Sequence, residues 1–198
     1  MPDELRVIVL LLHLIAMVFM AAPLYALIAV NERARFTVPP GYNTDRYLEN
    51  LIKYQTVRCY AYQAVIVATG IVLVWVRASG SDWAWWADWA LITKVVAVAI
   101  LVTLLSQIHF GIQPKIEAIV NKYKPSEEIS PEDRPNLLAW RSRRKRRAPI
   151  CLFLVLTALV MGVRVLFGYA PWLVAIFLVA SAIFAWRAYK TPVRMGWF

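Results

Sequence analysis

An uncharged apolar stretch at residues 7–30 most constrains what this chain can fold into. As α-helix, its roughly 24 residues are long enough to cross the hydrocarbon core of a bilayer, which is about 30 Å thick. Gly168 and Pro171 divide the last long apolar block, which as one helix would be about 58 Å long. The sequence therefore predicts an all-α polytopic transmembrane helix bundle in a single domain. We expect about five spans, a four-helix core plus one, at residues 7–30, 57–76, 86–112, 148–168 and 171–186.

Basic residues predict how this bundle is oriented in the membrane. The loops after the first and third predicted spans are basic, above all residues 113–147, and so is the tail with Arg187, Lys190 and Arg194. Because Lys and Arg accumulate in cytoplasmic loops, we expect the N-terminus outside and the C-terminus in the cytoplasm. The predicted location is the inner (cytoplasmic) membrane of a bacterium, with residues 113–147 as a cytoplasmic loop.

The charge distribution also indicates the partners. The net charge is +10, but the basic residues lie beside apolar spans, which favours anionic lipid head groups over nucleic acid. We expect the basic run at residues 141–147 to face those head groups, and other membrane protein subunits are further candidate partners. Cys59 and Cys151 are far apart and form no CxxC motif, so neither a metal site nor a disulfide framework follows.

Three cationic or titratable side chains are predicted inside the outer half of the membrane. His13 and Lys94 should lie about 10 and 12 Å below the outer surface, and Arg164 lies near the outer end of its span. Such residues are costly in lipid and need a partner. An anionic ligand would provide one: a porphyrin whose metal is bound by His13, with Lys94 or Arg164 on the propionates. Alternatively, Arg164 snorkels to head groups and Lys94 is neutral or solvated.

Other residues leave several interpretations open. His109 is an interfacial histidine, a second ligand, or part of a quinone site with Gln107. Met17 and Met20 lie on one helix face with His13, which suits either packing or copper(I). Residues 83–89 hold four tryptophans, which form an interfacial belt or stack on a pigment. The sequence contains no carboxylate pair, nucleophile–base set or HExxH motif, so the catalytic residues are unknown and enzymatic activity is undecided.

Two short segments resemble a known family. Residues 12–16 (LHLIA) and 23–25 (PLY) are similar to the first span of the HemJ-type protoporphyrinogen oxidase and CopD-like group, and Trp89 followed by Lys94 resembles its second motif. The resemblance implies that His13 and Lys94 are essential and associated with haem b. We therefore expect a haem-b-binding or tetrapyrrole-binding membrane protein with a redox role. The alternative is a non-catalytic accessory subunit of a bioenergetic or photosynthetic complex.

Overall fold

The fold was analysed in a computed structural model, which describes residues 3–31, 42–124, 127 and 129–190. The described residues contain helices and no strand. Five of these helices are long and apolar enough to cross a membrane, which fits an integral membrane protein and confirms the predicted all-α class. The helical segments are α1 (Asp3–Asn31), α2 (Tyr42–Ser79), η2 (Trp85–Ala87), α3 (Trp89–Ser106), η3 (Gln107–Ile112), α4 (Gln113–Val120), α5 (Asp133–Phe167) and α6 (Pro171–Lys190).

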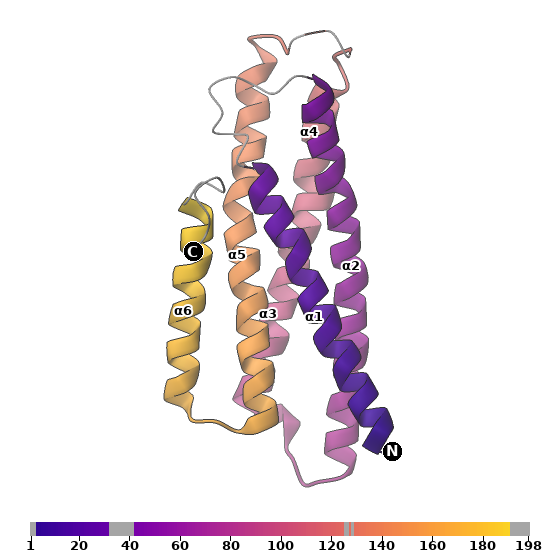
Figure 1. Ribbon diagram of the computed structural model, residues 1–198, viewed down its shortest axis with the longest axis vertical. Coiled ribbons are helices and arrows are strands. Elements are labelled where there is room, and N and C mark those ends of the chain that lie inside the picture. The colour runs from indigo at the N-terminus through magenta and orange to yellow at the C-terminus, as the bar shows by residue number, and fades with distance from the viewer. Residues whose placement is uncertain (1–2, 32–41, 125–126, 128, 191–198) are drawn as a thin grey trace.

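Four of the long helices surround a common apolar core. α1 packs against α2 and α5, and α3 packs against α5, whereas α6 lies on the far side of α5 (Figure 1). The core between α1, α2, α3 and α5 is built by residues such as Met20, Ile66, Leu101 and Val155. We call the end of the bundle with residues 80–88 the tryptophan end, and the opposite end the charged end.

Two helices are longer than the predicted spans. The span expected at residues 57–76 belongs to α2, which begins at Tyr42, and the span expected at 148–168 belongs to α5, which begins at Asp133. The 38 residues of α2 correspond to about 57 Å of helix, well beyond the thickness of a hydrocarbon core. The expected loop at 113–147 is accordingly mostly helix. Hydropathy marks only the part of a helix that lipid can cover, so the predicted spans began too late in both helices.

The extra turns form a head at the charged end, where α2, α4 and α5 extend past α1 and α6 (Figure 1). Apolar contacts between α4 and α5, including Ile116 and Leu137, hold it together. Lys122, just beyond α4, donates hydrogen bonds to both carboxylate oxygens of Asp133 (3.2 and 3.0 Å), which raises the pKa of Lys122. The chain after α4 is thereby tied to the start of α5.

A cluster of buried charges crosses this head. Arg144, with no exposed surface, donates to Glu49 (2.7 and 3.2 Å) and to Gln113 (2.6 Å). Arg141 donates to Glu49 (3.1 Å) and to Asp45. The expectation that the whole run 141–147 faces lipid head groups therefore needs correction. Two of its arginines point inward because carboxylates on α2, about 95 positions away in the chain, neutralise them.

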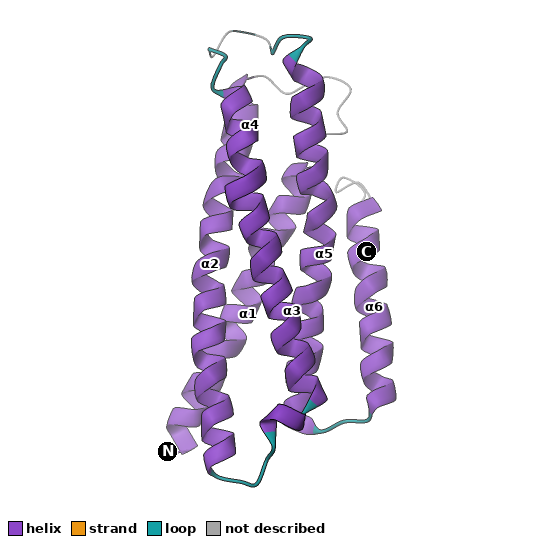
Figure 2. Ribbon diagram, turned by 180° about the vertical axis from the view of Figure 1, so that it is seen from behind, coloured by secondary structure: helices purple, strands orange, loops and turns teal. Residues whose placement is uncertain are grey.

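A π-helical turn precedes Pro114 in the third span. Pro114 lies just beyond the span predicted at residues 86–112, yet α3, η3 and α4 run past it as one continuous helix (Figure 2). Proline has no N–H to donate to the carbonyl four residues earlier. The π-helical turn η3 absorbs this defect, with the N–H of Gln113 bonded to the carbonyl of Ile108. π-turns are rare and commonly occur as such single insertions.

The break between the last two spans is confirmed. Gly168 adopts φ 65°, a left-handed conformation that side chains disfavour, and its N–H bonds to the carbonyl of Arg164 at 2.9 Å. α6 then starts at Pro171. α6 ends at Lys190, and Arg194, which contributed to the orientation argument, lies outside the described residues.

Candidate functional site

His13 lies on the buried face of α1. Its side chain is 5% exposed, and the buried residues Ala16, Met17 and Met20 follow at helical spacing, while most of the other residues on this part of α1 face outward. The imidazole therefore points into the bundle, as its cost in lipid predicted.

A hydrogen-bond chain determines the tautomer of His13. Its Nδ1 lies 2.8 Å from the Thr69 hydroxyl, which donates its own proton to the carbonyl of Val65 at 2.6 Å. The hydroxyl must then accept, so Nδ1 carries the imidazole proton and Nε2 carries the lone pair. Thr69 on α2 thus orients the ring and leaves Nε2 as the acceptor.

Lys94 meets that lone pair directly. Lys94 Nζ lies 2.9 Å from His13 Nε2, so it donates a hydrogen bond across the α1–α3 interface. The structure thereby brings together the two residues that the sequence singled out, 81 positions apart in the chain. The prediction placed them in one layer of the bundle but did not foresee direct contact.

Two glycines flank the pair closely. A Cβ atom added to Gly162 on α5 would lie 3.0 Å from Lys94 Nζ, tighter than ordinary contact. A Cβ atom on Gly70 would lie 3.5 Å from His13 Cε1, an ordinary contact distance. α1, α2, α3 and α5 therefore all contribute to the site. Sequence analysis missed Thr69, Gly70 and Gly162; an adjacent threonine and glycine in an otherwise apolar span were the available signal.

Arg164 is not part of the His13–Lys94 contact. Its guanidinium faces the rings of Trp89 (5.9 Å) and Tyr169 (5.8 Å), close to the tryptophan end. Its Nε is buried and has no hydrogen-bond partner among the described residues. The three cationic groups therefore do not converge: two touch each other, and the third lies nearer the helix ends.

His109 lies at a different place from His13. It sits in the π-turn, where its ring packs edge-on against Tyr60 (5.8 Å between centroids) and Phe110 (4.7 Å). Fifteen residues of helix place it about 22 Å along the axis from Lys94. His13 and His109 therefore cannot bind opposite faces of one haem.

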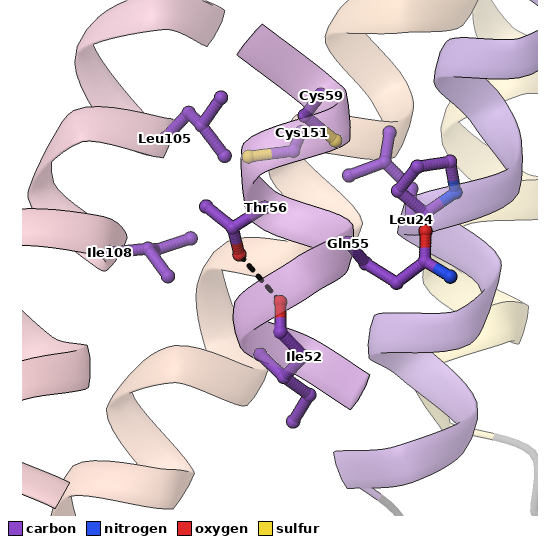
Figure 3. Close-up of a pocket in the computed structure, with 9 residues that line it drawn as sticks. Leu24, Ile52, Gln55, Thr56, Cys59, Leu105, Ile108 and Cys151 are labelled. Atoms are coloured by element: carbon purple, nitrogen blue, oxygen red, sulfur yellow. Dashed lines mark hydrogen bonds between the residues drawn. The ribbon is translucent and has the colours of Figure 1, made fainter. Parts of the chain in front are cut away.

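The sulfur-containing side chains considered as copper ligands or thiols lie in the core. Met17 and Met20 pack with apolar residues in the central cluster, and the described residues contain no group of three or more His, Cys, Asp or Glu placed to hold a metal ion. Cys59 and Cys151, distant in sequence, line the same small cavity between α2 and α5 (Figure 3). Its volume is about 20 Å³, enough for one water molecule and too little for a cofactor.

The tryptophans of residues 83–89 form no stacked platform. Trp85 and Trp86 pack edge-to-face at 5.8 Å and are 47% and 67% exposed. Trp83 instead packs against the guanidinium of Arg77 (4.2 Å) and donates its indole N–H to Asp88 (3.1 Å). This arrangement favours the interfacial belt over a pigment sandwich.

Comparison of the chain with family models, with curated proteins and with solved structures finds no match. No activity or cofactor is therefore transferred from a relative, and the functional argument depends on the residues of this site.

Proposed function

We propose that this membrane helix bundle binds haem b or a related tetrapyrrole through His13, with Lys94 as the partner of an anionic group. The observation that supports this is the buried contact of 2.9 Å between Lys94 Nζ and His13 Nε2, which points the ammonium group at the ring nitrogen that would bind the metal. Neutral imidazole nitrogen is a common iron ligand in haem proteins, and a hydrogen bond on its other nitrogen orients it.

His13 would hold the iron of the tetrapyrrole, and Lys94 would hold one of its anionic groups. His13 would supply Nε2 to the iron, and Thr69 would keep the proton on Nδ1. Lys94 occupies Nε2 in this structure, so its side chain must move aside before a ligand binds. Once displaced, the ammonium needs a new counter-charge, which a propionate group supplies. Haem, when bound, would contribute a one-electron redox couple.

The proposal includes the orientation of the bundle. With the tryptophan end outside and the charged end in the cytoplasm, the basic segments share the cytoplasmic side of a bacterial inner membrane. Arg143 and Arg146 are exposed at the charged end and remain available to anionic lipids, whereas Arg144 does not.

Absorption spectra test the haem proposal. The protein purified in mild detergent, with haem supplied during expression, should show a Soret band and a reduced α-band. His13→Ala should abolish both bands, while Lys94→Met should weaken binding or shift the reduction potential. His109→Ala is the matched control and should leave the spectrum unchanged, because this ring lies about 22 Å away along the helix.

The opposite pattern would overturn the proposal. If His109→Ala removes the chromophore and His13→Ala retains it, the site lies at the charged end. A protein that stays colourless with haem supplied, yet copurifies with other membrane subunits, favours the accessory-subunit alternative.

A further inference from the structure

A second site opens at the tryptophan end. A cavity of about 450 Å³ lies where α2 and α5 end and α3 begins, and neither His13 nor Lys94 lines it. That volume falls within the usual range for small-molecule sites. The polar and aromatic side chains around it include Arg77, Asp82, Trp83, Asp88, Trp89 and Arg164.

The two arginines have donors to spare. Arg77 donates one bond to the carbonyl of Val165, and Arg164 Nε is buried with no hydrogen-bond partner in the described part of the chain. Neither guanidinium has an ion-pair partner within the described part of the chain. A guanidinium has five N–H donors in a planar arrangement that matches the oxygens of a phosphate group. Both arginines can therefore donate hydrogen bonds to an anionic group of a ligand.

The two carboxylates at the cavity, Asp82 and Asp88, differ in the hydrogen bonds that they already accept. Asp88 caps α3 by accepting from the N–H groups of Ala90 (3.0 Å) and Leu91 (3.2 Å), and its other oxygen accepts from Trp83. Asp82 is exposed and makes no hydrogen bond or ion pair among the described residues. With two arginines and two aspartates the lining is neutral overall, so a ligand with both charges suits it better than an anion alone.

We propose that this cavity binds the zwitterionic head group of an aminophospholipid, with its phosphate on Arg77 and Arg164 and its ammonium group on Asp82. The position of the cavity along the bundle axis supports a lipid head group as the ligand. The cavity lies at the end of three spans, next to the exposed Trp85 and Trp86, and tryptophans are enriched at the membrane–water interface. The proposal is independent of haem at His13.

Native mass spectrometry of the full chain in detergent tests this site. Phosphatidylethanolamine, phosphatidylcholine and phosphatidylglycerol with identical acyl chains are titrated into the delipidated protein. We expect one tightly retained phosphatidylethanolamine. Arg164→Gln should weaken the retention of phosphatidylethanolamine and phosphatidylcholine alike, by about tenfold, the usual effect of losing a charge-assisted hydrogen bond. Arg164→Lys keeps the charge without the planar donors and should lie between the two.

Two further variants separate the parts of the proposal. Asp82→Asn should weaken the retention of both lipids and remove the preference for phosphatidylethanolamine over phosphatidylcholine, because both carry a positive charge but only the primary ammonium group donates hydrogen bonds to the carboxylate. Arg134→Gln is the control, since Arg134 is exposed at the start of α5, at the charged end and far from this cavity. It should leave both retentions unchanged. Thermal unfolding of each variant verifies that the bundle is intact.

Several outcomes would overturn the proposal. Equal retention of lipid by the unmodified protein and by Arg164→Gln would show that Arg164 does not bind the phosphate group. Preference for phosphatidylglycerol would show that the ammonium group is not recognised. Displacement by inorganic phosphate or glycerophosphoethanolamine at the same concentration as the lipid would identify a soluble phosphate ligand instead.

Discussion

Replacing Arg144 should destabilise the protein far more than replacing its neighbour Arg143. Arg144 is completely buried and holds Glu49 and Gln113 through three hydrogen bonds of 2.6 to 3.2 Å. Arg143 is exposed and stacks on the ring of Trp140. Substitution by glutamine removes one positive charge at either position. The two variants therefore differ only in the burial and the partners of the arginine that is lost.

The geometry determines the size of the effect. Arg144→Gln leaves the carboxylate of Glu49, which is 3% exposed, with one of its two arginine partners. Removing one side of a buried ion pair typically costs about 3–5 kcal/mol, because the remaining charge stays desolvated. Arg141 still reaches Glu49 at 3.1 Å, so we expect a loss near the lower limit, about 3 kcal/mol. Arg143→Gln should change the free energy of unfolding by no more than about 0.5 kcal/mol.

Denaturant titration in detergent, followed by tryptophan fluorescence and circular dichroism, measures the two free energies of unfolding. The double variant Arg144→Gln/Glu49→Gln is a further control. It should recover part of the loss, because a neutral amide is less costly to bury than an unpaired carboxylate. Equal destabilisation by Arg143→Gln and Arg144→Gln would refute the reasoning, since it would mean that the cluster contributes no more than a surface charge.

Three further predictions concern the site and the orientation. Thr69→Val should shift the ¹⁵N resonances of His13 away from the Nδ1–H tautomer in protein labelled only at histidine, and Thr69→Ser should restore them, because only the hydroxyl fixes the proton. Gly162→Ala should perturb the same resonances by crowding Lys94 at 3.0 Å, whereas Gly70→Ala, at 3.5 Å, should be tolerated; equal effects would contradict this. A cysteine replacing the exposed Ser81 should react with an impermeant thiol reagent outside intact cells, the native thiols being buried; labelling only after permeabilisation would reverse the orientation.

Part of the site was predictable, because a titratable side chain is energetically costly to place in an apolar span. His13 and Lys94 stood out because a titratable group in an apolar span needs a partner, whatever the rest of the fold. Their direct contact was not predictable, because it depends on the rotation of α1 and α3 about their axes. Thr69 and Gly162 carry no such cost, and the adjacent Thr69 and Gly70 in an apolar span were the only signal that the sequence offered.

Hydropathy by itself determined the number of long apolar segments, because transfer to lipid is a nearly additive property of consecutive residues. Gly168 and Pro171 marked the break in the last segment, because they disfavour a continuing helix. Only the tertiary structure decided which charges are buried. Arg143 and Arg144 are adjacent and chemically identical, yet one faces outward and the other meets Glu49 across the bundle. Likewise, Pro114 removes one backbone donor from its helix, but only the structure shows the π-turn that precedes it and lets the helix continue. Such outcomes depend on contacts between residues far apart in the chain, which no local pattern records.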